Sequence, residues 1–356
     1  MAKRILFLFP YPQGTAASQR FRFEQYYPAL EANGFTIDKQ AFIDDKTWAI
    51  LYKPGYTLPK IMGTLRGYFR RLGMMFSLGK YDYVFVHREA EFFGPPVFEW
   101  IIAKLAGKKL IYDFDDAIWI PNTSEHNGFF SKFKFYSNVP KVCKMAYKVS
   151  CGNDYLRNYA AQFNPNAVYN PTTIDTENHH NKVKDQSGNG FVIGWTGTHS
   201  TMQYLDALLP VFQKLEDKYD FTFNVISDTA PDFKLKSLKF TKWTKETEIE
   251  DLLQFNVGLM PLVDDKWANG KCGFKALQYM ALGIPALVSP VGVNTKIVDD
   301  GVNGFICTTT DDWYNALSKL MDDRQLLIDL GANTRKKIEA EYSVHSNATN
   351  FITLFS

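Results

Sequence analysis

The N-terminal half of the chain alternates short apolar runs with stretches of helical periodicity. Apolar runs with polar boundaries predict buried strands at 3–10, 35–43, 81–89 and 108–116. Between the first two, residues 21–33 have the spacing of a helix, and Asn33-Gly34 gives that helix a C-terminal stop. Strands that alternate with helices favour a parallel sheet. Because ligands of such sheets bind beyond the carboxyl ends of the strands, the charged residues at 87–89 and 113–116 stand where chemistry is expected.

The pattern changes between residues 163 and 190, in a stretch rich in Asn, Pro, Asp, Ser and Gly that is typical of an interdomain linker. A second series of apolar runs follows, with strands expected at 191–197, 221–227, 257–262, 284–290 and 305–310. From 323 to 355 the pattern is helical, with a weak point at Tyr342-Ser343. We therefore expect an α/β protein in which two Rossmann-like domains face a central cleft.

The expected domain boundaries follow from these two series. We expect an N-terminal Rossmann-like domain at 1–170, a linker at 171–190 and a C-terminal Rossmann-like domain at 191–340. The last segment, 341–356, is expected to be a helix that packs back on the N-terminal domain. A length of 356 residues agrees with two domains.

The composition is that of a packed globular protein, with 46% hydrophobic and 22% charged residues. The first apolar run, Ile5–Phe9, is too short for the core of a signal peptide, and no run of apolar residues is long enough to predict a transmembrane helix. The four cysteines have no zinc-binding spacing, which favours reduced thiols and a cytoplasmic location.

Charge is divided unevenly along the chain. Residues 1–173 hold 22 Lys and Arg against 14 Asp and Glu, whereas the remainder holds 18 against 24, which points to different partners for the two halves. The segment 46–80 has seven basic residues and no acidic one. Its helical part, 61–80, fits either a helix on an anionic membrane surface or a buried helix with a basic outer face. No nucleic-acid recognition motif accompanies this charge, so nucleic acid is not an expected partner.

The most informative stretch runs from Trp267 to Pro285 and reads WANGKCGFKALQYMALGIP. Gly270 and Gly273 allow the backbone to approach a ligand closely, and a helix is expected directly after them. The unpaired N–H groups of a helix start attract phosphate, and Lys271 and Lys275 add two cations on about one face. A capped helix with two solvated lysines fits the same pattern.

This stretch resembles the donor-binding signature of retaining glycosyltransferase family 4, whose fold is GT-B. The resemblance continues in SPVGVNTKIVDDGVNGF at 289–305, and YDFDDAIW at 112–119 and GWTGTHSTMQYL at 194–205 resemble a subgroup typical of bacterial surface-polysaccharide synthesis. It implies a sugar transferase that acts with retention. Where the basic segment 46–80 is the membrane-binding helix, the expected location is peripheral, on the inner face of the plasma membrane. The implied donor is a UDP- or GDP-linked sugar, and the implied acceptor is a glycan or a lipid-linked glycan.

The resemblance also implies a donor site, mainly in the C-terminal domain. The expected donor-binding residues are Gly14, Thr15, Thr196, Gly197, Thr198, Lys271, Gly273, Phe274, Lys275 and Gln278. Where many family members carry two glutamates, this chain has Gly270 and Gln278. Gln278 can still hydrogen-bond a ribose hydroxyl, whereas Gly270 has no side chain with which to contact a sugar.

The catalytic candidates stand at strand ends. Many family members place a His-Asp pair where this chain has Asp115-Asp116, which implies that Asp115 accepts a proton or stabilises positive charge near the anomeric carbon. Capping of a following helix by Asp115 or Asp116 is the alternative. His87 is a third candidate, although a lone histidine is more often structural. Arg20 and Arg22 are candidates for binding an acceptor phosphate, or for a solvated helix start.

No metal or other required cofactor is expected. Asp113–Asp115 forms a D-x-D, the metal-binding motif of the other large glycosyltransferase fold, but the second Rossmann-like series and the lysine-bearing helix favour GT-B. His179-His180 has no third ligand nearby in the sequence. Two other functions stay open: a nucleotide-sugar epimerase or phosphorylase with the same fold, and a non-catalytic sugar-nucleotide-binding protein.

Overall fold

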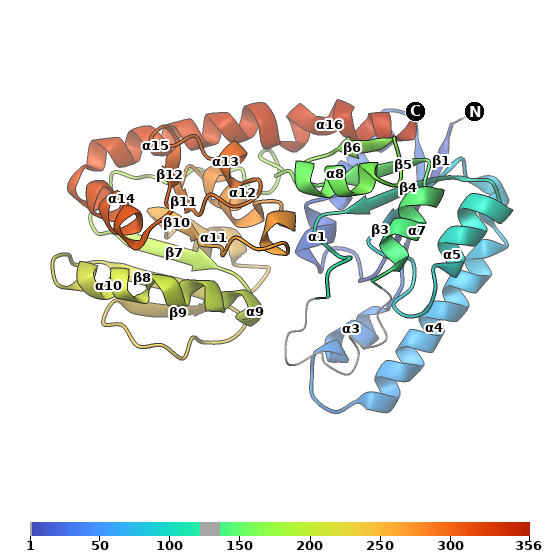
Figure 1. Cartoon of the computed structure of the whole chain (residues 1–356), viewed down its shortest axis with the longest axis horizontal. Helices are drawn as coiled ribbons and strands as arrows, with labels where there is room; N and C mark the ends of the chain where they lie inside the picture. Colours follow the sequence, from blue (N-terminus) through green and yellow to red (C-terminus); the bar gives the residue numbers. More distant parts are fainter. Residues whose placement is uncertain (1, 122–135) are drawn as a thin grey trace. The chain divides into compact units, whose positions relative to one another are not determined.

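The computed structural model describes residues 2–121 and 136–356. The chain divides into two compact units: unit 1 is Met1–Thr172 with Ala348–Ser356, and unit 2 is Thr173–Asn347. Each unit contains one six-stranded sheet with helices, so the expected α/β class with two Rossmann-like units is confirmed (Figure 1). Most of the segment expected as a linker thus belongs to unit 2, and the chain returns to unit 1 at Ala348.

The sheet of unit 1 is entirely parallel, with the strand order β2-β1-β3-β4-β5-β6. The strands are β1 (Arg4–Phe9), β2 (Thr36–Ala41), β3 (Tyr83–His87), β4 (Lys109–Phe114), β5 (Lys148–Cys151) and β6 (Ala167–Tyr169). The register pairs His87 with Asp113, and Asp113 with Ser150. Because all strands run the same way, these three residues meet at the carboxyl edge of the sheet.

The helices of unit 1 surround this sheet. They are α1 (Ala17–Arg20), α2 (Tyr27–Ala32), α3 (Asp45–Leu51), α4 (Thr57–Met75), α5 (Val97–Trp100), α7 (Asn138–Met145) and α8 (Asp154–Ala161). The core is aromatic: the ring of Phe7 on β1 lies 5.7 Å from that of Phe23 and 4.9 Å from that of Phe85. The run RILFLF is buried after its first residue, as its continuous apolar pattern predicts.

The C-terminal residues complete unit 1. α16 (Val344–Ile352) begins after the break expected at Tyr342-Ser343, and its later part stacks Phe351 on Tyr26 with ring centroids 4.3 Å apart. Lys148 on β5 donates to the carbonyl of Thr353. The last residues therefore pack against both a helical segment and a strand of unit 1.

Unit 2 repeats the design with the order β12-β11-β10-β7-β8-β9, again all parallel. Its strands are β7 (Val192–Thr196), β8 (Thr222–Ser227), β9 (Leu238–Lys242), β10 (Val257–Met260), β11 (Ala286–Val288) and β12 (Gly304–Ile306). Its helices are α9 (His199–Met202), α10 (Leu209–Glu216), α11 (Glu248–Leu252), α12 (Phe274–Ala281), α13 (Asn294–Ile297), α14 (Thr310–Asp322) and α15 (Arg324–Lys337). Trp195, Phe212, Phe223 and Trp313 are among its core residues.

A membrane-crossing helix requires length and apolar character together. Within residues 2–121 and 136–356, no helix combines the two to the extent that crossing a bilayer requires.

Candidate functional site

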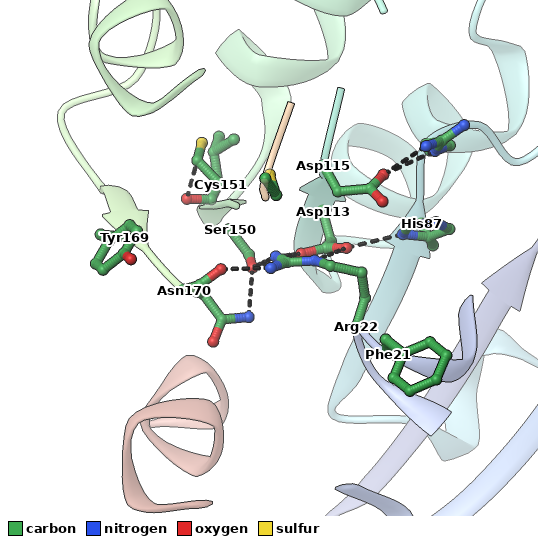
Figure 2. A network of polar contacts seen from close by, with 12 residues as sticks. Phe21, Arg22, His87, Asp113, Asp115, Ser150, Cys151, Tyr169 and Asn170 are labelled. Atoms are coloured by element: carbon green, nitrogen blue, oxygen red, sulfur yellow. Dashed lines mark hydrogen bonds and ion pairs between the residues drawn. The ribbon is translucent and has the colours of Figure 1, made fainter. Parts of the chain in front are cut away.

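Asp113 lies at the centre of a buried polar network at the carboxyl edge of the unit 1 sheet (Figure 2). It accepts hydrogen bonds from Nδ1 of His87 at 2.8 Å and from the hydroxyl of Ser150 at 2.6 Å. The guanidinium of Arg22 forms an ion pair with the same carboxylate and donates to the carbonyl of Asn170. Figure 2 shows Arg22 between Asp113 and Asn170, so the network joins the ends of three strands to the segment after α1.

The charge of Asp113 is fixed by these partners. Burial alone would raise the pKa of this carboxyl group, but the positive charge of Arg22 and the hydrogen bond from His87 hold its pKa well below the usual range. Asp113 is thus a buried carboxylate that is ionised at neutral pH. An ionised carboxylate that is enclosed by Arg, His and Ser is not arranged as part of a D-x-D metal site.

This network changes the roles expected of two candidates. Arg22 is fully buried and its guanidinium is held by Asp113, so the expected contact with an acceptor phosphate does not agree with its place in the structure. His87 is also fully buried, and its Nε2 has no hydrogen-bond partner among the residues that the structure describes. Both side chains are buried and contact Asp113 at the carboxyl edge of the sheet. Arg20 is nearly buried as well, with its guanidinium over the ring of Phe21.

Asp115 and Asp116 lie beyond the end of β4 and share one cation, Arg88. Nε of Arg88 donates to Asp115 at 2.9 Å, and its Nη2 donates to Asp116 at 2.6 Å. The Asp115 side chain is directed to this ion pair and away from the Arg22 network (Figure 2). Their side chains keep 13% and 24% of their surface exposed, so both carboxylates are accessible as well as paired. Through Pro121 no helix follows, and capping is not observed there.

Arg88 holds an unusual backbone conformation. Its φ is 60°, in the left-handed region that non-glycine residues rarely adopt. Its N–H donates to the carbonyl of Asp113 at 2.7 Å, and its carbonyl accepts from the hydroxyl of Tyr112 at 2.8 Å. Strained backbone of this kind concentrates at functional sites. The sequence analysis placed residues 87–89 where chemistry is expected, but it gave Arg88 no role of its own.

The first loop of unit 1, which follows β1, holds Gly14 and Thr15. Gly14 has φ 77°, and its N–H donates to the Glu24 carboxylate at 2.8 Å. Gln19 is buried and binds both the N–H and the carbonyl of Tyr11 at 2.9 Å. The side chains of Gln19 and Glu24 therefore fix the conformation of the loop by hydrogen bonds to its backbone. Gly14 and Thr15 remain partly exposed.

The corresponding loop of unit 2 follows β7. The N–H of Thr196 donates to the hydroxyl of Tyr279 at 2.9 Å, which ties the loop to α12. At Gly197 an added Cβ would lie 2.6 Å from the ring of Trp195, so only glycine fits without displacement. Thr196 is nearly buried, whereas Thr198 is exposed at the start of α9.

The start of α12 is shaped by Gly273, whose φ is 71°. An added Cβ there would lie 2.1 Å from Cδ1 of Ile297. Glycine has no side chain with which to cap the helix, so α12 begins without a side-chain cap. Nζ of Lys275 lies 5.2 Å from the ring centroid of Trp195, and Nζ of Lys271 lies 5.8 Å from that of Trp267. The two lysines are thus positioned by aromatic rings beside the helix start.

Gln278, which the resemblance assigns to a ribose hydroxyl, is paired with a carboxylate. It is buried, and its amide donates to the carboxylate of Glu248 at 3.4 Å. Glu248, at the start of α11, also accepts from the indole N–H of Trp243 at 3.4 Å. The sequence analysis did not single out Glu248. Many family members carry a glutamate at position 278, where this chain has a glutamine. Glu248 brings a carboxylate next to that glutamine.

Metal ligands are not grouped in the described part of the chain. Among residues 2–121 and 136–356, no three His, Cys, Asp or Glu side chains converge so as to hold a metal ion. His179 faces Glu248, with Nε2 3.7 Å from the carboxylate.

The structure thus assembles two groups of candidates, one in each unit. Unit 1 brings together Asp115, Asp116 and Arg88, with Gly14 and Thr15 on a neighbouring strand end. Unit 2 gathers its candidates around the end of β7 and the start of α12: Thr196, Gly197, Thr198, Lys271, Gly273, Phe274 and Lys275.

Residues 190–323 match the family model described as glycosyl transferases group 1. No curated protein matches the chain by sequence. Over 99% of its length the chain is similar in structure to sucrose-phosphate synthase from Thermosynechococcus elongatus, covering 98% of that chain with a TM-score of 0.71 and 12% identity. It is similar over 99% to Anabaena HepE in complex with UDP and glucose, covering 98% of that chain with a TM-score of 0.67 and 13% identity.

A third similar structure is the catalytic domain of starch synthase IV from Arabidopsis thaliana bound to ADP and acarbose. The similarity covers 100% of this chain and 99% of that one, with a TM-score of 0.69 and 10% identity. At these identities the similarity shows the fold, which is GT-B. The matched domain and the shared fold together support a glycosyltransferase of the GT-B type.

Proposed function

We propose that the chain transfers a sugar, with retention, from a UDP- or GDP-linked donor to a glycan or lipid-linked acceptor in cell-surface polysaccharide or glycoconjugate synthesis. The observation that carries this proposal is the start of α12. There α12 begins at a glycine without a side-chain cap, and Lys271 and Lys275 lie beside the first turn. This arrangement suits a diphosphate, because dipole, N–H donors and two cations act together.

The position of this helix within unit 2 supports the proposal. It lies inside residues 190–323, the part that matches group 1 glycosyl transferases. HepE was solved with UDP and glucose, and starch synthase IV with ADP and acarbose, so two proteins of this fold hold a nucleoside diphosphate and a sugar. In our proposal Lys275 and Lys271 stabilise the charge that develops on the leaving diphosphate.

The remaining donor contacts fall to neighbouring residues. The loop after β7, which includes Thr198, follows Trp195, whose ring lies 5.2 Å from Nζ of Lys275 in the first turn of α12. We assign the ribose hydroxyls to the Gln278–Glu248 pair. A hydroxyl forms a stronger hydrogen bond with a carboxylate than with a neutral amide oxygen, so Glu248 strengthens the contact that Gln278 alone would make. For Gly14 and Thr15 we keep the expected contact with the donor's diphosphate and sugar.

Our proposal of retention is supported by the pairing of Asp115 and Asp116 with Arg88. A carboxylate held by a guanidinium must give up part of that pair to take a proton, so it is poorly suited to activate an acceptor hydroxyl as a general base. We infer that the departing diphosphate takes this proton on the face it leaves, so that the new bond forms on the same face. Asp115 then acts by stabilising positive charge at the anomeric carbon.

The test is calorimetric titration of UDP, GDP and their sugar derivatives, followed by product analysis. Wild type should bind one nucleotide series. Lys275→Ala should weaken that binding by about tenfold or more, as expected for loss of a charge-assisted contact. Lys236→Ala, an exposed lysine of the same unit, is the matched control and should bind normally. Unchanged affinity in Lys275→Ala would contradict the diphosphate assignment.

The same experiment separates the rival functions. A product with the inverted anomeric configuration would contradict retention. Release of an altered nucleotide sugar without any acceptor would identify an epimerase. Binding without turnover across a panel of glycan acceptors would favour a non-catalytic sugar-nucleotide-binding protein.

A further inference from the structure

Helix α4, coloured blue in Figure 1, turns its smallest side chains toward the rest of unit 1. An added Cβ on Gly63 would lie 2.2 Å from the hydroxyl of Thr47, and one on Gly67 would lie 2.6 Å from the carbonyl of Phe42. Arg71, one turn further on, is fully buried and donates to backbone carbonyls of three other segments. The inner face of α4 is thus made of two glycines and an anchoring arginine.

The large apolar side chains of α4 occupy the opposite face, three or four residues apart. We call this set the α4 stripe: Leu58, Ile61, Met62, Leu65, Phe69, Leu72 and Phe76, the last of these directly after the helix. All seven are exposed, and Phe69 and Phe76 expose 70% and 88% of their surface. A stripe with this spacing normally faces a core. Its outward position overturns the interpretation of α4 as a buried helix with a basic outer face.

The charged residues of the segment that carries the α4 stripe are all basic. Residues 46–80 contain no Asp or Glu. Arg66 and Arg70 are exposed on α4 itself, and Lys53 and Lys80 are exposed before and after it. Two carboxylates from outside this segment lie near it: Asp44 is 3.6 Å from Arg66, and Asp38 is 3.4 Å from Lys80. An apolar band with a cationic border complements a surface that is apolar inside and anionic at its edge.

We propose that α4 binds the surface of an anionic lipid bilayer, with the α4 stripe inserted at the level of the headgroups and upper acyl chains. Helices with a large apolar face and basic flanks bind in this way, parallel to the membrane plane. Lys53, Arg66 and Lys80 add attraction to anionic headgroups. The inner face of α4 stays on unit 1, because glycines 63 and 67 and Arg71 fit the surface beneath them.

A second copy of the chain is a less suitable occupant of this face. A two-fold interface through the α4 stripe would place α4 against its own copy. Arg66 and Arg70 would then meet like charges, with no acidic residue in 46–80 to compensate them. Lipid headgroups of opposite sign avoid this repulsion. The membrane site is independent of the donor site in unit 2, so either proposal can fail without the other.

The experiment is co-flotation of the full chain with phosphatidylcholine vesicles, with and without phosphatidylglycerol. The apolar variant is Leu65→Ser with Phe69→Ser, and its matched control is Phe240→Ser, an exposed phenylalanine of unit 2. The charge variant is Arg66→Glu, with Lys236→Glu as its control. Circular dichroism and light scattering establish that each variant is folded and give its oligomeric state.

Wild type and both controls should float with the anionic vesicles, and less so as salt is added. The Leu65/Phe69 double variant should lose about tenfold or more of its partition coefficient, because two inserting side chains are removed. Arg66→Glu should lose binding only where phosphatidylglycerol is present. Equal flotation of folded apolar variant and wild type would overturn the proposal. A wild-type dimer that the apolar variant disrupts, without vesicle binding, would assign the stripe to a second copy instead.

Discussion

Arg22 and Asp113 form an ion pair in which neither side chain is exposed, and the two residues lie 91 positions apart in the chain. The pair draws in His87, Ser150 and Asn170, so it ties β3, β4 and β5 to the segment after α1. Arg88 directly follows the last residue of β3, and Asp115 directly follows the last residue of β4, so both lie just beyond the strands that this network joins. We therefore expect the loss of the buried Arg22–Asp113 pair to lower the stability of the fold at the strand ends that precede Arg88 and Asp115.

Arg22→Ala should reduce the free energy of unfolding by about 3–5 kcal/mol, because it leaves Asp113 buried without its cation. The control is Arg4→Ala, which breaks the exposed pair with Asp38 and should cost about 0–1 kcal/mol. Urea unfolding measures both. A folded Arg22→Ala protein with unchanged stability but weakened acceptor binding would instead restore the phosphate-binding interpretation of Arg22.

Asp113 should also make stability fall in acid. Its pKa in the folded chain lies below the unfolded value of about 3.9, so the unfolded chain takes up this proton first as the pH falls. The stabilisation by Asp113 is therefore present above about pH 4 and is lost as the pH falls toward the folded pKa. Urea unfolding between neutral and acid pH should show a flatter dependence in Asp113→Asn than in wild type. Asp45→Asn, at an exposed carboxylate, should keep the wild-type slope.

Much of the fold could be predicted because its strands are continuous apolar runs. All nine expected strands are present, since runs such as that of β1 are buried on both faces of a parallel sheet. The strands that were missed, β5, β6 and β9, are short or lie toward a sheet edge, where burial is partial and the apolar signal is weak. The helix break at Tyr342-Ser343 was also predicted correctly.

The candidate sites were less predictable, because charge pairing between distant residues leaves no local pattern. Arg22 and His87 have the same residue types whether they face a substrate or a buried carboxylate. Only the register, which places Asp113 between His87 and Ser150, decides this. For the same reason Glu248 was not singled out and Arg88 was given no role of its own. α4 shows a further limit: its apolar spacing predicted a helix, but not which face would be buried.

Gly273→Ala should destabilise the chain more than Gly301→Ala. Both glycines have φ 71°, so both substitutions carry the same kind of backbone strain, of order 1–3 kcal/mol. Only at Gly273 does the new Cβ meet a neighbour, Ile297, which adds roughly 1–3 kcal/mol of overpacking. Urea unfolding should show this difference. Adding Ile297→Ala should remove the clash but open a cavity. The loss of unfolding free energy in the double variant should therefore be smaller than the sum of the losses in the two single variants.

The same variants test the donor site. Gly273→Ala shifts the helix start and should weaken nucleotide binding in calorimetry, whereas Gly301→Ala should bind as wild type does. If both variants bind nucleotide equally well, the start of α12 does not hold the diphosphate.

Asp115→Asn should lower the rate of sugar transfer by about a hundredfold, while the affinity for the donor stays unchanged. The amide keeps the shape of the side chain but removes the negative charge that we assign to the anomeric carbon, and loss of one such electrostatic contact costs on the order of 10²-fold. Arg88→Lys keeps the cation but loses the fork that binds Asp115 and Asp116 together, so its rate should be intermediate. Initial rates at saturating donor measure both, with Asp45→Asn as the control. A wild-type rate in Asp115→Asn would remove this residue from the catalytic site and leave it as a partner of Arg88 alone.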